Sequence, residues 1–215
     1  LESWDAARHP AQQRLRMYIA SVIPLFPEVA NHDGAPLALA LSVGLEDHIA
    51  LTRGGHDLDN YLFPLARAFG AHRFSVFFAH KRHAGTSTLT IGCASPDPND
   101  RGMPHLQVRT RVSATSKAWK EAIHEACRQA SPQLAADVPV HLQLAFQVSP
   151  GRNWSALWKP AIDALGPVLG LADPARPYRP RDDRITRLEL HRTIDSALGH
   201  DIVLTARWHD ATVGA

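Results

Sequence analysis

The 215-residue sequence has little cysteine, no long apolar run and almost no net charge. Cys93 and Cys127 are too few for a disulfide framework and form no CxxC pair, so we expect a reducing compartment and no thiolate zinc site. The apolar runs are far too short to cross a bilayer, and no basic segment followed by an apolar one precedes Trp4. We therefore expect a soluble, cytoplasmic protein.

Charge and histidine content narrow the function only slightly. The formal net charge of +2 permits nucleic-acid binding without arguing for it, because charge must be clustered to attract a partner. The chain has 13 histidines but neither an HxxxH nor an HExxH motif, so we expect no dedicated histidine metal site.

Hydrophobic periodicity predicts similar elements, in a similar order, in the two halves of the chain. In the first half it predicts a helix at 11–26, a strand at 36–45, a helix closing at Gly70, and strands at 73–81 and 87–94. In the second half it predicts a strand at 106–112, a helix at 116–130, a strand at 138–148, a helix at 158–166, and strands at 182–192 and 201–208. Between them "ASPDPNDRGMP" (94–104) combines three prolines with Asp, Asn and Gly, and indicates a linker.

Short stretches of the two halves also match residue by residue. "FPLARAFG" (63–70) aligns with "KPAIDALG" (159–166), and "RFSVFFAHK" (73–81) aligns with "RITRLELHR" (184–192) in alternating register. We infer an internal duplication of roughly 100 residues, with units 1–95 and 105–215 joined by a linker at 96–104. The predicted fold class is α/β, with two tandem helix-strand-helix-strand-strand units forming a pseudo-twofold dimer in one chain.

Two carboxylates stand before the helix that closes at Gly70. Asp57 and Asp59 are two residues apart and are followed by Asn60, so in an extended segment both carboxylates point the same way and could face one metal ion. The same residues could instead cap the helix, because Asp and Asn before an apolar helical pattern satisfy free amides and suit the helix dipole.

In the second half, Lys159 lies on the matching helix and Asp182 and Asp183 stand together at the opening of a predicted strand. The order of these motifs resembles that of the RusA-like Holliday-junction resolvases. In that order a strand is followed by a DxDN loop, then by a helix with Lys four residues after the second Asp, and then by DD at the opening of a strand. The resemblance implies a small α/β homodimer that uses magnesium to cut branched DNA. A tandem chain would then be similar to one such dimer made in a single polypeptide.

The motif is divided between the halves. The first half keeps DxDN as residues 57–60, but Phe63 occupies the lysine position, and Ala71 and His72 stand in place of DD. The second half keeps the lysine and the DD pair, but has Asn153, Trp154, Ser155 and Ala156 in place of DxDN.

Magnesium-dependent phosphodiester hydrolysis needs several convergent oxygen ligands and a cation near the developing charge. We expect Asp57, Asp59 and Asp183 to hold Mg²⁺ or Mn²⁺, with Asp182 as a further carboxylate and Lys159 beside the phosphate. If each site forms within one half, as the resemblance implies, the two partial sets lie apart. A strand exchange between the halves could join them into one composite site. Adjacent residues in a strand face opposite ways, so only one of the DD pair would face the site; a simple polar turn is the alternative for this pair.

Basic side chains are clustered in two matching places and form the predicted phosphate-binding surface. They are Lys81, Arg82, Arg179, Arg181, Arg184, Arg187 and Arg192. Some of them could merely pair with nearby acidic residues.

The predicted function is therefore that of a nucleic-acid-binding protein that resembles a metal-dependent, structure-selective endonuclease with a divided or degenerate active site. Its expected partner is branched DNA. The alternatives are a catalytically inactive DNA-binding protein and a protein-interaction module on the same fold.

Overall fold

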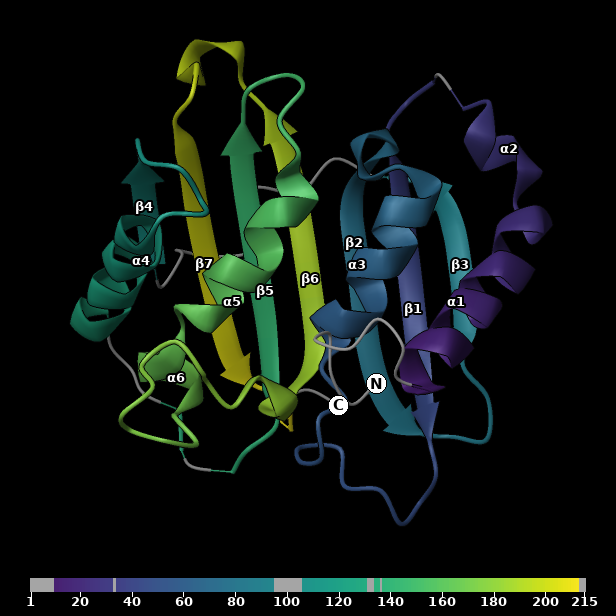
Figure 1. Ribbon diagram of the computed structural model, residues 1–215, viewed down its shortest axis with the longest axis horizontal. Helices are drawn as coiled ribbons and strands as arrows, with labels where there is room; N and C mark the ends of the chain where they lie inside the picture. The colour runs from purple at the N-terminus through teal and green to yellow at the C-terminus, as the bar shows by residue number, and fades with distance from the viewer. Residues whose placement is uncertain (1–9, 33, 95–105, 131–133, 136, 213–215) are drawn as a thin grey trace.

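The computed structural model describes residues 10–32, 34–94, 106–130, 134, 135 and 137–212 (Figure 1). The strands in this part of the chain are β1 (Leu37–Leu45), β2 (Phe74–His83), β3 (Thr88–Cys93), β4 (Leu106–Thr110), β5 (Val140–Val148), β6 (Ile185–Ile194) and β7 (Ile202–Asp210). They form one mixed sheet in the order β3-β1-β2-β6-β5-β7-β4. The predicted α/β class is confirmed.

The directions of the strands decide which loops meet. β1 runs parallel to β2 and β5 runs parallel to β6, whereas β2 and β6 pair antiparallel at the centre of the sheet. The ends of β1 and β2 therefore lie at the same sheet edge as the start of β6. By the same reasoning, the ends of β5 and β6 lie at the edge where β2 starts.

The helices lie in front of the sheet in Figure 1. Their bounds are α1 Pro10–Val22, α2 Pro27–Ala30, α3 Leu58–Phe69, α4 Lys117–Gln129, α5 Trp158–Asp163 and α6 Gly166–Leu169. Single turns of 3₁₀-helix occur at Ile23–Leu25, Ala71–Arg73, Trp154–Leu157, Asp182–Arg184 and Ser196–Leu198. None of the helices within the described ranges is long and apolar enough to cross a membrane.

Alternation along the strands builds the core. In β1, Leu39, Leu41 and Val43 are buried, and the residues between them point to the other face. At the centre, Phe77 of β2 packs against Trp154 and Trp158 of the second half, with ring centroids 5.6 and 4.9 Å apart. The two halves therefore share one core.

Helix boundaries follow the residues that end or begin them. α4 begins after Ser116, whose side-chain oxygen accepts a hydrogen bond from the backbone amide of Trp119 at 3.3 Å. α3 is followed by Gly70 in the left-handed region, with φ of 83°, which confirms the helix predicted to close there.

Some predicted boundaries are wrong. The strand expected from residue 182 begins at Ile185, because Asp182–Arg184 form a 3₁₀ turn. Arg184 is buried and donates hydrogen bonds to the backbone carbonyls of Val138, Leu169 and Ala135, which hold this turn in place. The helix predicted at 158–166 is divided into α5 and α6, and the predicted linker at 96–104 lies outside the described residues.

Candidate functional site

Acidic side chains from both halves gather at the sheet edge where β1 and β2 end and β6 begins. We call this group the acidic cluster; it contains Asp57, Asp59, Lys81, Lys159, Asp182 and Asp183. Each half keeps its own strands, so the hypothetical strand exchange is not what joins the partial motifs. They meet because β2 and β6 lie side by side and antiparallel.

Lys159 of α5 joins carboxylates of the two halves. Its ammonium nitrogen lies 2.6 Å from Asp182 Oδ2, 3.4 Å from Asp163 Oδ1 and 3.7 Å from Asp59 Oδ2. Burial lowers the pKa of Lys159, but the carboxylates around it, with Asp59 and Asp182 foremost, outweigh that cost and raise the pKa above its ordinary value. The ammonium group therefore stays charged.

Asp57 stands at the N-cap position of α3 without acting as a side-chain cap. Its carboxylate accepts no hydrogen bond from the free amides at the start of the helix. Its Oδ2 accepts instead from the Asn60 side-chain amide at 3.1 Å, and its Oδ1 is buried with no hydrogen-bond partner in the described part of the chain. Helix capping therefore explains why Asp57 stands at the start of α3, but it does not explain why its carboxylate is buried without contacting the helix amides.

Burial and like charge raise the pKa of two aspartates. Burial, followed by the negative charges of Asp182 and Asp59, raises the pKa of Asp57 to about 7. Burial also raises the pKa of Asp59 to about 6, although Lys159 opposes the change. Carboxyl groups whose pKa values lie this close to neutral pH lower the stability of the folded state when they are ionised. Strongly shifted pKa values of this kind are common at functional sites.

Lys81 belongs to the acidic cluster and not to the surface. The residue is 4% exposed, and its ammonium group donates to the backbone carbonyls of Asp183 at 2.6 Å and His56 at 3.1 Å. Burial lowers its pKa to about 8, against the opposing effect of Asp57 and Asp183. Lys81 is placed to hold the turn before β6 and not to contact a phosphate.

Asp182 and Asp183 have different surroundings although both lie in the same turn. Asp182 is held by Lys159, while Asp183 Oδ1 is buried without a hydrogen-bond partner within the described ranges. Burial raises the pKa of Asp183, which Arg181 and Lys81 counteract.

The donor chemistry of the acidic cluster fits a hard divalent cation. Mg²⁺ and Mn²⁺ prefer carboxylate oxygens, and the unpartnered oxygens of Asp57 and Asp183 are such donors. Four carboxylates face two ammonium groups in the cluster, which leaves an excess of two negative charges when all six groups are ionised. As the side chains stand, no group of three or more His, Cys, Asp or Glu residues in the described ranges could hold a metal ion. Asp57, Asp59 and Asp183 are the residues that would supply oxygen ligands.

The residues predicted to bind phosphate lie in several different places. Arg184 is 2% exposed and its guanidinium group is taken up by three backbone carbonyls, so it is structural. Arg181 forms an ion pair with Asp137 at 2.7 Å. Arg82 donates to the Ser42 hydroxyl at 2.9 Å, and Arg179 is exposed.

Arg187 and Arg192 lie on opposite faces of β6, as the strand period requires. Arg187 lies on the face away from the helices, opposite His80 of β2. Arg192 lies on the helix side, where its guanidinium group stacks over the Trp154 ring at 5.6 Å and donates to the His72 carbonyl at 2.9 Å.

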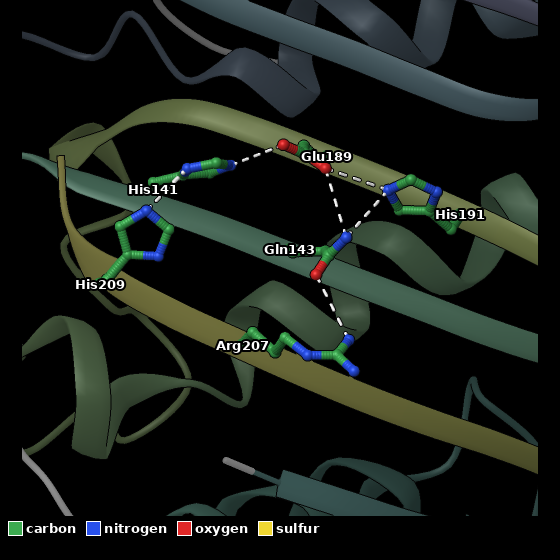
Figure 2. A network of polar contacts seen from close by, with 6 residues as sticks. All are labelled: His141, Gln143, Glu189, His191, Arg207 and His209. Carbon is green, nitrogen blue, oxygen red and sulfur yellow. Dashed lines mark hydrogen bonds and ion pairs between the residues drawn. The ribbon is translucent and has the colours of Figure 1, made fainter. Parts of the chain in front are cut away.

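Figure 2 shows a second polar group on β5, β6 and β7, on the face of the sheet away from the core. Its members are His141, Gln143, Glu189, His191, Arg207 and His209. Glu189 lies at the centre, 2.9 Å from His141 Nε2, 3.2 Å from His191 Nε2 and 3.3 Å from Gln143 Nε2. Arg207 of β7 also donates to Gln143 Oε1 at 3.3 Å, so the buried side chains of Gln143 and His191 have hydrogen-bond partners.

Sequence reasoning missed the position of Lys81. The signal that could have found it is the alternation in β2, where Phe77, Ala79 and Lys81 share the buried face. It also missed Asp163, which pairs with Lys159 and, at 2.7 Å, with Lys120 of α4.

Comparisons of this chain with protein-family models, with curated proteins and with solved structures find no match. The resemblance to RusA-like resolvases therefore stays a prediction from the motif residues of the sequence.

Proposed function

We propose that this chain is a nucleic-acid-binding protein of the RusA-like type, in which one composite acidic site carries out metal-dependent cleavage of branched DNA. The observation that carries the proposal is the meeting of the divided motif in the acidic cluster. Asp59 of the first half and Asp182 of the second lie 3.7 and 2.6 Å from the same Lys159 ammonium group.

We also propose that the chain is a tandem duplication folded as a pseudo-twofold dimer. The sheet supports this, because β3-β1-β2 on one side of its centre corresponds to β7-β5-β6 on the other, with the same relative directions. The central antiparallel pair of β2 and β6 would then be the contact between the two units.

The register of the central pair agrees with this symmetry. The aligned segments are offset by 111 residues, from Arg73 to Arg184. Three residue pairs of the β2–β6 ladder are Val76–His191, Phe78–Glu189 and His80–Arg187. When each residue is replaced by its counterpart at the offset of 111, the first pair becomes the third, the third becomes the first, and Phe78–Glu189 is unchanged.

Two contacts between the halves obey the same offset. Lys81 donates to the Asp183 carbonyl at 2.6 Å, and its counterpart Arg192 donates to the His72 carbonyl at 2.9 Å. Each basic side chain thus holds the turn before the other unit's strand, as expected for two equivalent units.

The residues of the acidic cluster have separate parts in the proposed reaction. A bound Mg²⁺ or Mn²⁺ would neutralise charge on the phosphate and activate water. Asp57, Asp59 and Asp183 would hold the ion, and Lys159 would stabilise negative charge that develops on the phosphate. The loop that carries Arg179 and Arg181 leads directly into Asp182, so a strand held by that loop would reach the cluster.

DNA binding without cleavage is the second candidate function. It is favoured by the close ion pair of Lys159 with Asp182, because the ammonium group already supplies positive charge among the carboxylates. In this case the protein would bind branched DNA equally well with and without a divalent cation.

Cleavage and gel-shift assays of a four-way junction, beside linear duplex of equal length, separate the two candidates. We expect cleavage with Mg²⁺ or Mn²⁺ that EDTA abolishes, and that Asp57→Asn and Asp183→Asn each remove while junction binding persists. Asp47→Asn changes an exposed aspartate outside the cluster and serves as the matched control.

Each other outcome has a defined meaning. Junction binding that EDTA does not alter, with no cleavage under any metal, would leave the second candidate. Cleavage that survives both cluster substitutions would refute the composite site, and the absence of any DNA binding would refute both candidates and favour a protein-interaction module.

A further inference from the structure

A pocket of about 880 Å³ opens at the opposite sheet edge from the acidic cluster. Its walls come from α3 and the Ala71–Arg73 turn of the first half, and from the loop that follows β5 and the end of β6 in the second half. Its polar lining consists of Arg67, His72, Arg152, Asn153, Ser155 and Arg192.

The lining of this pocket is basic. It contains three arginines and a histidine but no carboxylate. Arg67, Arg152 and Arg192 form no ion pair with any carboxylate of the described ranges. Three guanidinium groups around one hollow, with no acidic partner, indicate a site for an anion.

Arg192 is fixed in the wall before any ligand arrives. Its Nη2 donates to the His72 carbonyl at 2.9 Å, and its guanidinium carbon lies 5.6 Å from the centre of the Trp154 ring. Its Nε is buried and has no hydrogen-bond partner within the described part of the chain. A side chain held in this way presents its remaining donors with little loss of conformational freedom on binding.

The pocket corresponds to the acidic cluster when the two halves are aligned, but its charge is reversed. Every acidic position of the cluster is occupied here by a residue without a carboxylate: Asp57 by Asn153, Asp59 by Ser155, Asp182 by Ala71 and Asp183 by His72. Phe63 stands in the place of Lys159. Nothing remains in the pocket to hold a divalent cation, whereas Arg67 and Arg152 add positive charge.

We propose that this pocket binds a phosphate group through Arg67, Arg152 and Arg192, and that the ligand is a phosphodiester of a second nucleic-acid strand, which it holds without cutting. The assignment to a strand rests on the proposed function, whereas the affinity for phosphate follows from the pocket alone. A guanidinium group matches the paired oxygens of a phosphate, and three of them oppose its full charge.

The first test uses inorganic phosphate and isothermal titration calorimetry in a buffer without other anions of similar shape. We expect the wild-type protein to bind phosphate, and Arg67→Gln and Arg152→Gln each to weaken binding at least about tenfold, as the loss of a charged hydrogen bond requires. Arg128→Gln removes an exposed arginine of α4 that pairs with Glu125 of its own helix, and it should leave phosphate binding unchanged.

The second test measures junction affinity of the same variants by gel shift over a range of salt concentrations. If the pocket holds a strand phosphate, each pocket substitution lowers affinity and reduces the salt slope by about 1, whereas Arg128→Gln does neither. At constant ionic strength, competition of junction binding by free phosphate that the pocket substitutions abolish would give the same assignment.

The outcomes separate this inference from the proposed function. Loss of phosphate affinity with unchanged junction affinity would overturn the strand assignment and leave a site for free phosphate. The wild type could bind the junction while neither pocket substitution changes phosphate affinity or junction affinity. That result would overturn the inference and leave the proposed function standing. Phosphate binding that depends on the pocket, in a protein that binds no DNA, would refute the proposed function and retain the pocket.

Discussion

Replacing Asp57 by asparagine should stabilise the protein at pH 8 while abolishing its proposed cleavage. Folding raises the pKa of this carboxyl group from its ordinary value of 3.8 to about 7, chiefly through burial and then through the charges of Asp182 and Asp59. The folded state therefore binds a proton more tightly than the unfolded state does. The contribution of Asp57 to stability is therefore fully present below about pH 4 and is lost as the pH rises towards 7.

The magnitude follows from the size of the pKa change. A rise from 3.8 to about 7 costs the folded state about 4 kcal/mol once the pH exceeds both values. Asparagine keeps the shape of the side chain and can still accept the hydrogen bond from Asn60. Because its amide is also polar and partly buried, we expect it to recover about 2 kcal/mol of that cost at pH 8. At pH 4 the gain should fall below about 1 kcal/mol, since the native carboxyl group is then protonated.

Urea unfolding in EDTA, followed by tryptophan fluorescence at pH 4 and pH 8, measures both quantities. Asp47→Asn removes an exposed carboxylate and should change stability little at either pH. A variant of Asp57 that is less stable than wild type at pH 8, or equally stabilised at both pH values, would refute the argument from burial and like charge.

Four further results are expected. Lys159→Met should lower stability by about 1–3 kcal/mol at pH 8, with a smaller loss at pH 4, because the carboxylates of Asp59 and Asp182 lose their cation; the same unfolding assay measures this. Trp154→Ala should cost about 3–5 kcal/mol, since the ring is fully buried in the shared core. Arg184→Gln should cost at least about 2 kcal/mol in urea unfolding, because buried carbonyls lose their donors. On a four-way junction labelled on each strand in turn, one bound protein should nick a single strand, and paired nicks in a single turnover would contradict an assembly with only one acidic site.

The elements of the fold could be predicted from the sequence because each carries a local signal. Alternating apolar residues mark β1 and β6, and Gly70 marks the end of α3, so these elements were found nearly in place. The error at Asp182 and Asp183 has a physical cause. A turn before β6 is held by Arg184 through carbonyls distant in sequence, and no local pattern reveals those partners.

The candidate site was less predictable because it depends on which strands are neighbours. Asp57, Asp59, Lys159 and Asp182 were all identified as candidates from motif positions, yet their meeting was expected to require a strand exchange. Their actual meeting depends on the antiparallel pairing of β2 with β6, which is a choice of tertiary structure. The sequence predicts Lys81 as part of a phosphate-binding surface, although the alternation of side chains along β2 places it inside.

Under the proposed duplication, fusion of two units in one chain would give a reason for the opposite charges at the two sheet edges. In a homodimer, every substitution changes both symmetry-related sites, so a basic side chain that suits one site is also present in the other. In a tandem chain, Arg152 can enter one pocket while Asp182 stays in the other, because each position is encoded once. In the proposed assembly, the carboxylates concentrated at one edge would favour a metal cation and the arginines at the other would favour a phosphate, so the two sites would not compete for the same ligand. An assembly of this kind would hold one strand of a symmetric junction at the basic pocket while the acidic cluster acts on the other.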